Sequence, residues 1–434
     1  MLTTDLRDEV SRLLADLIAI DTTNPPGNET PAAQHLAAYL ARSGVEADLV
    51  GRVPERANLL ARIHGRGSGP SLLLLSHTDV VPAAPAEWSV PPFSGLDRDG
   101  CIWGRGALDM KGQVAAEAVA FAALAREGWR GNGDLILCSV ADEEVGAGFG
   151  AMWLAEEHPD LIRCDYVVNE GGGERLEHRG RIAYTVNVGE KMCSGFEITV
   201  RGRSGHASIP DLADNPVPKL VPVIERIDRM PRPTRDLPEL QAFLRAIGEE
   251  GADPVEVAGR ARQDGSPVVA ELIPPMLGAV ITPTGLEASA SLNVIPGSAR
   301  LRCDCRILPG QTPAEVRTAV EAALEGIDHQ FEFLEEEGGT ASPSESPLWD
   351  AIDAFVGTIE PGAIAVPTIS TGFTDSHFLR EALGCVAYGF SPLRADPIAA
   401  AALVHSADER ISKDDLALGV ECYMQVARDI GALG

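Results

Sequence analysis

Positive charge is scarce in this sequence of 434 residues. Lysine and arginine together number 36, against 64 aspartates and glutamates, which gives a formal net charge of −28. Binding to nucleic acid or to an anionic membrane surface needs basic patches, so this balance argues against both classes of partner. It still allows an anionic small molecule, because a bound cation or a local arginine can dominate the charge inside a cleft.

Long apolar runs and paired cysteine motifs are also absent. No apolar run approaches the ~20 residues that a transmembrane helix needs. The first twenty residues carry charges throughout and lack the apolar core of a secretory signal, so we expect a cytoplasmic protein. The eight cysteines are scattered, and Cys303 and Cys305 have no second pair with which to complete a zinc site. We interpret the cysteines as reduced, structural residues.

A histidine at the end of a leucine-rich run is the most informative feature that is present. Residues 71–81 read SLLLLSHTDVV, and the run predicts a strand covered on both faces. Ligands of open α/β sheets bind beyond the carboxyl ends of such strands, where His77 lies. Asp79 projects to the same side and can orient a metal-binding imidazole. A histidine that merely caps a strand end is the alternative, and this motif alone does not decide between them.

Acidic residues gather at the ends of two further predicted strands and in one glycine-rich loop. They are Glu143 and Glu144 after residues 134–140, Glu170 after residues 164–168, and Asp109 in the loop before a predicted helix over 114–127. Carboxylates that converge on one edge of a sheet repel each other unless cations lie between them. The sequence therefore predicts a cation site at this edge.

Two histidines and three carboxylates suit a pair of divalent ions, with one carboxylate bridging them. His405, at the end of an alanine-rich segment, supplies the second histidine. Two dications and three carboxylates leave one positive charge, which a bridging hydroxide would neutralise. One acid of the Glu143–Glu144 pair is then left over, and a carboxylate that is not a ligand is a natural general base there.

An ordered set of motifs resembles the co-catalytic metallopeptidase family that includes aminoacylase, acetylornithine deacetylase, succinyl-diaminopimelate desuccinylase and glutamate carboxypeptidase. The motifs read SHTDVVP, GRGALDMKG, ADEEVG, NEGG, GHAS, NVIPG and HSADE, and they span nearly the whole chain. Each motif is weak alone, but their order is specific. The resemblance implies a hydrolase that holds two divalent metal ions, with zinc as the first expectation and cobalt or manganese as alternatives.

The resemblance also implies a role for each polar residue of the cluster. As ligands it gives His77 and Glu170 for one ion, Glu144 and His405 for the other, and Asp109 as the bridge. It further implies that Asp79 orients His77, and that Glu143 is the general base. The Asp109–Met110 peptide bond is expected to be cis, as is typical after the bridging aspartate of this family.

The apolar pattern changes in the middle of the chain. Alternation of apolar and polar residues predicts strands with one exposed face over 196–200, 288–294 and 299–307. We therefore predict an α/β fold, in which residues 1–193 and 309–434 form a mixed, mostly parallel sheet flanked by helices. Residues 194–308 would form an inserted α+β domain that resembles the lid or dimerisation domain of the family. Within it, residues 229–275 suggest an extra helical insertion, as in the Gly-X carboxypeptidase branch.

The resemblance assigns substrate contacts mainly to the lid. His206 would reach into the active site of a partner subunit and polarise the scissile carbonyl, which implies a homodimer through the lid. Asn293 would contact the substrate, and Arg306 would bind its carboxylate through paired donors. Gly372 lies in a loop that would hold the same carboxylate by backbone N–H groups, although Phe373 departs from the glycine-rich pattern of the family. Without the resemblance, His206 and Arg306 would be interpreted as surface residues.

The sequence thus predicts a hydrolase that cleaves an amide bond beside a free carboxylate in a small substrate, such as an N-acyl amino acid or a short peptide. Glu143 would take a proton from a metal-bridged water and pass it to the leaving amine. Dipeptidase or carboxypeptidase specificity is the alternative to aminoacylase or deacetylase specificity. A non-catalytic binding module on the same fold is a further alternative, disfavoured because every predicted ligand and Glu143 are present.

Overall fold

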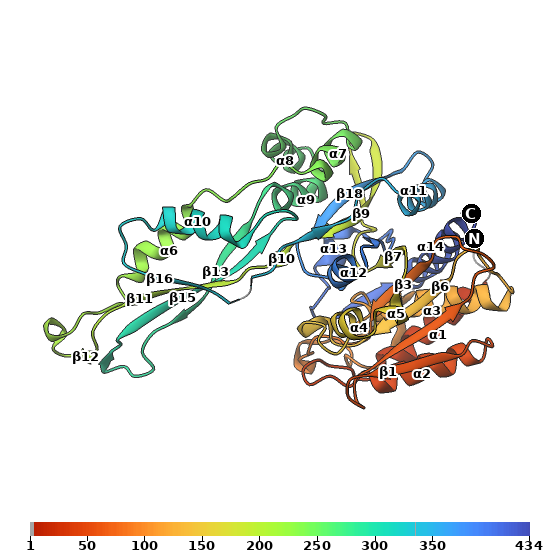
Figure 1. Ribbon diagram of the computed structural model, residues 1–434, viewed down its shortest axis with the longest axis horizontal. Helices are drawn as coiled ribbons and strands as arrows, with labels where there is room; N and C mark the ends of the chain where they lie inside the picture. Colours follow the sequence, from red (N-terminus) through yellow and green to blue (C-terminus); the bar gives the residue numbers. More distant parts are fainter. Residues whose placement is uncertain (1–3, 335) are drawn as a thin grey trace.

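A computed structural model describes residues 4–334 and 336–434 and shows an elongated molecule built on two large sheets (Figure 1). Among the described residues, the main sheet has ten strands and the second sheet has five. There are also two small sheets. One pairs β12 (Gly205–His206) with β14 (Val294–Ile295), and the other has the strand order β20 (Arg410–Ser412), β5 (Cys101–Trp103) and β4 (Leu96–Arg98). The second sheet projects away from the main sheet, and the small sheet that contains β12 lies at its far end.

The main sheet has a parallel centre and antiparallel edges. Its strands follow the order β1-β2-β6-β3-β7-β19-β9-β17, and β8 and β18 also pair with β9. Their bounds are β1 (Ala47–Gly51), β2 (Ala57–Ile63), β3 (Leu72–His77), β6 (Leu135–Val140), β7 (Tyr166–Asn169), β8 (Arg175–His178), β9 (Arg181–Glu190), β17 (Thr340–Ala341), β18 (Ile364–Ser370) and β19 (Val386–Gly389). The neighbours β6, β3, β7 and β19 are all parallel. This arrangement confirms the predicted mixed, mostly parallel sheet.

The continuous leucine run of β3 is explained by apolar cores on both faces of the sheet. Leu72 and Leu74 belong to the cluster that contains the helix α3 (Lys111–Arg126), whereas Leu73 and Leu75 belong to a second cluster with α4 (Ala151–Glu157). All six residues of β3 are buried. A strand between two helical layers has no polar face, so its sequence is apolar throughout.

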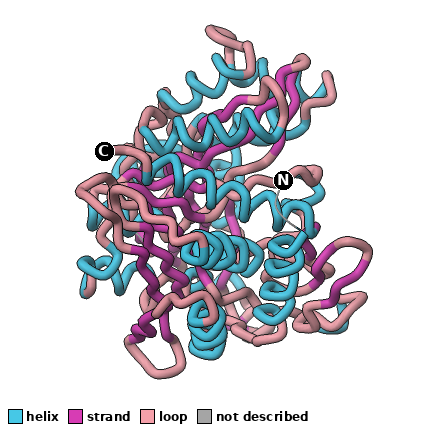
Figure 2. The backbone as a smooth tube through the Cα atoms, turned by 90° about the vertical axis from the view of Figure 1, so that its right-hand side faces the viewer, coloured by secondary structure: helices cyan, strands magenta, loops and turns pink. Residues whose placement is uncertain are grey.

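The helices of the main-sheet part surround the strands when the molecule is seen from that end (Figure 2). Besides α3 and α4 they are α1 (Thr4–Ile18), α2 (Thr30–Ala41), α5 (Pro159–Ile162), α11 (Pro347–Ile359), α12 (Ser376–Leu383), α13 (Pro397–Ala401) and α14 (Lys413–Gly431), with the 3₁₀ turns η1 (Pro85–Glu87) and η2 (Glu143–Val145). Helices α1, α3 and α14 pack against one another. No helix among the described residues is both long and apolar enough to cross a membrane.

The second sheet has one helical layer and one exposed face. Its strands are β10 (Met192–Cys193), β11 (Phe196–Arg201), β13 (Val280–Glu287), β15 (Ser298–Ile307) and β16 (Gln330–Phe333), covered by α6 (Leu220–Arg229) and α10 (Pro313–Ala323); the turn η3 (Pro210–Leu212) lies near β12. Burial alternates along β15, as the sequence pattern predicts. The predicted strand over 288–294 is wrong, because β13 ends at Glu287 and only Val294 of that segment is in a strand.

The packing differs from the predicted domain ranges in two places. Residues after 308 return to the second sheet, since α10 packs on it and β16 pairs with β11. Conversely, the predicted helical insertion folds as α7 (Pro238–Ala246), α8 (Pro254–Gln263) and α9 (Pro267–Leu277), and its apolar residues join the core of the main sheet. Helices α7 and α9 contact β18 there. The apolar residues of these helices are therefore buried against β18 and β8 of the main sheet.

Candidate metal centre

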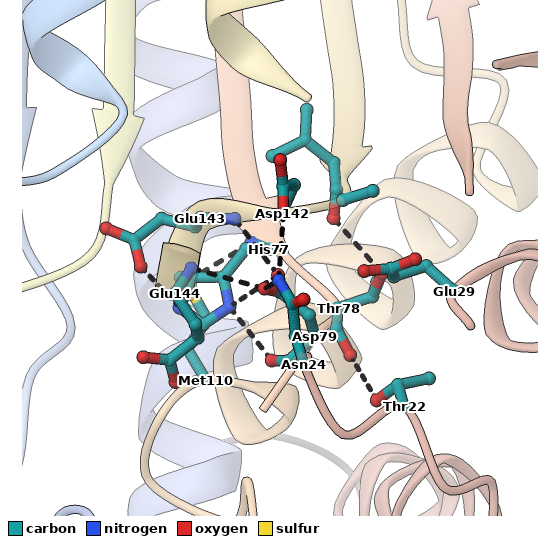
Figure 3. Close-up of polar contacts among 12 residues, drawn as sticks. Thr22, Asn24, Glu29, His77, Thr78, Asp79, Met110, Asp142, Glu143 and Glu144 are labelled. Carbon is teal, nitrogen blue, oxygen red and sulfur yellow. Dashed lines mark hydrogen bonds and ion pairs between the residues drawn. The ribbon is translucent and has the colours of Figure 1, made fainter. Parts of the chain in front are cut away.

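Polar side chains from separate strand ends meet at the carboxyl edge of the main sheet (Figure 3). His77 is the last residue of β3, Glu143 and Glu144 form the turn η2 after β6, and Glu170 follows β7 directly. Because β3, β6 and β7 are parallel neighbours, their carboxyl ends lie side by side. The structure thus brings together the acids and the histidine that the sequence placed after three strands.

Asp109 lies between the two predicted histidine ligands. One of its oxygens, Oδ1, is 3.1 Å from Nε2 of His77, and the other, Oδ2, is 3.1 Å from Nε2 of His405. His405 also lies 3.3 Å from Glu144 Oε2. On the other side, His77 Nε2 is 3.7 Å from Glu170 Oε2. Asp109 therefore has the geometry of a carboxylate that could bridge two cations. Glu170 would lie beside one cation and Glu144 beside the other.

The donor set fits divalent metal ions. Two groups of three residues have ligand atoms within 4.8 Å of one another, namely His77, Asp109 and Glu144, and His77, Glu143 and Glu170. Within the described chain, Oε1 of Glu144 and Oε1 of Glu170 are buried without a hydrogen-bond partner. Buried carboxylate oxygens are rarely left unpaired, so these atoms point to a ligand. Imidazole nitrogens with carboxylate oxygens suit zinc, cobalt and manganese.

The second of these groups contains Glu143, which was predicted to be a base and not a ligand. Its Oε2 lies 4.0 Å from His77 Nε2, slightly farther than Glu170 Oε2. Distance alone does not separate a ligand from a base at this position. The assignment of Glu143 as the base therefore stays a prediction, and it has a direct experimental test.

Nearby carboxylates control the pKa of both histidines. Burial alone would lower the pKa of His77, but hydrogen bonds with acids, first among them Asp109, raise it well above its usual value. Hydrogen bonds with Asp109 and Glu144 raise the pKa of His405 to about 10. Burial would raise the pKa of Asp109, yet the hydrogen bonds with the two histidines outweigh it and lower that pKa. The cluster thus attracts positive charge strongly.

The surroundings of two of the remaining acids favour the neutral form of each carboxyl group. Burial, and then the charge of Glu170, raises the pKa of Glu143 well above its usual value. Burial also raises the pKa of Glu170, against the opposing effect of His77. Crowded, desolvated carboxylates of this kind ionise readily only when a cation is present between them.

The Nδ1 side of His77 is fixed by Asp79. Nδ1 lies 3.1 Å from the backbone oxygen of Asp79 and 3.5 Å from its carboxylate Oδ1. A donor hydrogen on Nδ1 leaves the lone pair of Nε2 facing Asp109, which is the tautomer that a metal ligand needs. The carboxylate of Asp79 also accepts the backbone N–H groups of Glu143 and Glu144, each at 3.2 Å. One aspartate therefore positions both the histidine and the acidic turn.

Two residues that sequence reasoning left without a role complete this support. Asn24 donates from Nδ2 to Asp79 at 2.8 Å and to Asp142 at 2.9 Å. Glu409 accepts the backbone N–H groups of Gly106, Leu108 and Asp109, and pairs with Arg105 at 2.6 Å. Glu409 lies in the motif HSADE, so for this residue the motif was the available signal. The Asp109–Met110 bond is cis, as the resemblance implied.

Asp375 is a third missed residue. It precedes α12, its carboxyl group is buried, and its Oδ1 has no hydrogen-bond partner among the described residues. Burial raises its pKa well above the usual value, and the charges of His77 and Glu170 act on it, which places it near the metal cluster. No sequence pattern distinguishes this aspartate from others at the start of a helix. His377 on the same helix is also buried.

The predicted substrate residues of the second-sheet part lie elsewhere within the chain. His206 is in β12 at the far end of the molecule, exposed, with Ser208 on its Nδ1 (Figure 1). Asn293 is nearby, since its oxygen accepts the N–H of Ala207. Arg306 lies in β15 and its Nε contacts Asp304 at 3.1 Å. Gly372 differs from these, because it lies in the loop between β18 and Asp375, and its N–H reaches Ser370 Oγ at 3.3 Å.

Comparison with known proteins agrees with a metal-binding site in this chain. The model of Peptidase family M20/M25/M40 matches residues 73–429. Aminoacylase-1 from Sus scrofa is 29% identical over 429 residues, covering 95% of this chain and 93% of that protein. Succinyl-diaminopimelate desuccinylase from Bordetella avium is 28% identical over 419 residues, covering 93% and 94%.

Solved structures share the fold at lower sequence identity. An M20 family metallo-carboxypeptidase, Sso-CP2 from Sulfolobus solfataricus, has a TM-score of 0.72 at 20% identity, covering 98% of this chain and 99% of that one. The YXEP protein of Bacillus subtilis, described as a dinuclear metal binding peptidase from M20 family, has a TM-score of 0.61 at 15% identity and covers 98% of both chains.

The fold and the cluster of histidines and acids define a metal-dependent hydrolase with room for two ions. The chain belongs to Peptidase family M20/M25/M40, as the match over residues 73–429 shows.

Proposed function

We propose that the protein hydrolyses an amide bond beside a free carboxylate in a small substrate, as in N-acyl amino acids. The observation that carries this proposal is the position of Asp109, with one oxygen 3.1 Å from His77 and the other 3.1 Å from His405. A carboxylate shared in this way between two histidines is the arrangement that a two-metal hydrolase needs.

The proposed ligands are His77 and Glu170 for one ion, Glu144 and His405 for the other, and Asp109 between them. Two divalent ions, which we propose to be zinc, would supply a Lewis acid and a water that loses its proton near neutral pH. The unpaired Oε1 atoms of Glu144 and Glu170 support this assignment. Asp79 keeps His77 in the tautomer whose Nε2 can bind a metal.

Glu143 is the proposed general base. Its carboxyl group is positioned by the backbone hydrogen bond from its own N–H to Asp79, and its side chain is largely buried beside His77. A pKa raised by burial suits a group that must both take a proton from the attacking water and give it to the leaving amine. The same residue can serve both steps because it lies beside the proposed metal ligand His77.

His206, Asn293 and Arg306 are proposed to act in the assembled homodimer. His206 and Asn293 lie together at the exposed end of the second-sheet part, far from the metal cluster of their own chain. In a dimer formed through that part, they could reach the partner subunit's site, where His206 would donate to the developing oxyanion. Arg306 and the loop at Gly372 would bind the substrate carboxylate.

Relatives named aminoacylase-1 and succinyl-diaminopimelate desuccinylase support an N-acylated amino acid as the substrate. The name of the structural neighbour Sso-CP2, a carboxypeptidase, keeps peptides as the second candidate. The two classes differ in the acyl side of the substrate, while the metal cluster would serve both.

The deciding experiment is amine release from two matched sets, N-acetyl amino acids and dipeptides, with zinc or cobalt added. We expect turnover of the N-acetyl set. Turnover confined to dipeptides would instead assign peptidase specificity. Failure on both sets and on longer acyl chains, with both metals bound, would overturn the proposed hydrolysis in favour of a binding module.

A further inference from the structure

Cys164 and Cys385 form a pair of thiols that the metal site does not use. Cys164 precedes β7 and Cys385 precedes β19, and these two strands are parallel neighbours in the main sheet. The two thiol groups lie close enough for each to shift the pKa of the other. Both residues belong to the apolar cluster on the α4 face of the sheet. The contact therefore lies at the amino ends of the strands, opposite the edge that holds the metal ligands.

The geometry of the two strands suits a covalent link. Val386 is aligned with Tyr166, and the N–H of Val386 donates to the oxygen of Asp165 at 3.0 Å, so the strand pairing continues toward both cysteines. Cys164 and Cys385 are offset by one residue in this register, which in a regular pleat would put them on opposite faces. Cys164 lies two residues before β7, outside the regular strand, and both cysteines belong to the same apolar cluster. For strands about 4.8 Å apart and a rise of about 3.3 Å per residue, that offset gives a Cα–Cα distance of roughly 6 Å. Disulfides span Cα atoms about 4.4–6.8 Å apart.

The pair lies just beneath the surface. Each cysteine is 8% exposed, while the adjacent Arg163, Asp165 and Gly384 are exposed. A small oxidant can therefore approach this end of the sheet through flanking residues that are in solvent. By contrast Cys138, on β6 in the same cluster, is fully buried.

The surroundings make the two thiols unequal. The neighbouring thiol of Cys164, and then the guanidinium of Arg380, lowers the pKa of Cys385, although burial opposes both. The thiol of Cys385 and burial raise the pKa of Cys164 well above its usual value. Arg380 lies beside Cys385, since its Nη2 donates to the backbone oxygen of Ala387, two residues further along the chain, at 2.6 Å. A nearby cation favours the thiolate form, which is the form that reacts with oxidants.

We propose that Cys164 and Cys385 are a site of reversible oxidation, at which a peroxide converts the two thiols to a disulfide. The Cys385 thiolate attacks one peroxide oxygen, the O–O bond breaks, and water leaves after protonation, which forms a sulfenic acid on Cys385. The Cys164 sulfur then attacks the Cys385 sulfur, an S–S bond forms, and the hydroxyl group leaves as a second water. In balance, two thiols and one hydrogen peroxide give one disulfide and two waters, and the thiols lose two electrons to the peroxide.

The test uses the metal-loaded, full-length protein treated with a small excess of hydrogen peroxide. Free thiols are then alkylated under denaturing conditions, and the digest is analysed by mass spectrometry. We expect one linked pair of peptides that contains Cys164 and Cys385, six alkylated cysteines out of the eight in the chain, and full reversal by a dithiol reductant. Eight alkylated cysteines after treatment, or a link from either residue to another cysteine, would overturn the proposal.

Two single variants test the order of the steps. In Cys164→Ser the first step remains, so dimedone should label Cys385 as a sulfenic acid. In Cys385→Ser the link and the label should both be lost. Cys422→Ser, at a fully buried position in α14, is the matched control and should still form the link. Dimedone labelling of Cys164 in place of Cys385 would contradict the assignment of the reacting thiol.

Thermal unfolding of the wild-type protein tests the proposal without a variant. Because the link closes a long loop without moving the strands, the oxidised protein should unfold at a temperature higher by roughly 5 °C or more. Its bound metal should not change, since the pair lies at the opposite edge of the sheet. A lower unfolding temperature on oxidation would show that the link distorts the strands, and would contradict a pair already positioned for it. These outcomes do not depend on the proposed hydrolase function.

Discussion

Glu409 accepts a hydrogen bond from the backbone N–H of Asp109 at 3.1 Å, although 300 residues separate the two in the chain. The same carboxylate also accepts the N–H groups of Leu108 and Gly106, at 2.7 and 3.1 Å. A buried acid thus holds the loop that carries the proposed bridging ligand. The motif HSADE, near the end of the chain, thus fixes the geometry of the much earlier motif GRGALDMKG.

Glu409→Gln should weaken metal binding. The amide offers one acceptor oxygen where the carboxylate offers two, so at least one loop N–H would lose its partner. We expect metal affinity to fall by about 10–100-fold, as for other groups that position metal ligands, measured by competition with a zinc chelator. Glu249→Gln is the control, because Glu249 is also buried and paired, with His178 and Arg260, away from the cluster. Unchanged metal affinity in Glu409→Gln would contradict the role of Glu409 in holding the loop of Asp109.

Glu143→Ala should keep both metals and lose most turnover. If Glu143 moves the proton in both steps, its loss should lower kcat by about 10²–10⁴-fold, measured with the best substrate of the panel at saturating metal. Val145→Ala, in the same turn and exposed, is the control and should retain activity. Loss of one metal ion from Glu143→Ala would show instead that Glu143 is a ligand.

Removal of the metals should abolish activity and lower the unfolding temperature. Without cations the acids at the strand ends repel one another, and ligands that bind only the folded state stabilise it by mass action. A chelator followed by dialysis should therefore lower Tm, and zinc or cobalt should restore both Tm and turnover. Full activity of protein shown to be free of metal would refute the two-metal site.

Mixed dimers test whether His206 acts in the partner's site. His206→Ala and Glu143→Ala should each be inactive alone. After the two variants exchange subunits, half of the dimers are mixed and each has one intact site, so about one quarter of wild-type activity should return. Mixtures that stay inactive despite measured subunit exchange would show that His206 does not act across the dimer.

Glu117 should make stability depend on pH. This glutamate of α3 is fully buried, and burial raises its pKa to about 8. The folded protein then keeps a proton that the unfolded chain releases near pH 4.5. The favourable contribution of Glu117 is therefore complete below about pH 4.5 and is lost as the pH rises toward 8, at roughly 1.4 kcal/mol per pH unit.

The isosteric variant Glu117→Gln separates this effect from other titrations. It keeps the contact with Gln113 but carries no ionisable group. Urea unfolding at pH 5 and pH 8 should show wild type losing stability relative to the variant, by up to about 4 kcal/mol. Parallel pH profiles for the two proteins would contradict a buried, protonated Glu117.

Local patterns predicted the centre of the main sheet well. The run before His77 is apolar because Leu72 and Leu73 face separate cores, so the pattern of a covered strand was visible in the sequence. The strand over 288–294 was mispredicted because its alternation is that of an exposed loop, in which Leu292 is entirely exposed. Alternation shows which residues suit a sheet, but pairing with a neighbour decides whether a strand forms.

By itself, the sequence determined which strands are covered on both faces and which polar residues follow them, because burial and periodicity are local properties of the chain. It also carried the motifs that resemble the family. Only the tertiary structure decided that Asp109 lies between His77 and His405, that Glu409 holds its loop, and that the carboxyl group of Asp375 is buried near the cluster. The physical reason is that these contacts join residues far apart in sequence, and their partners are set by strand order and loop packing.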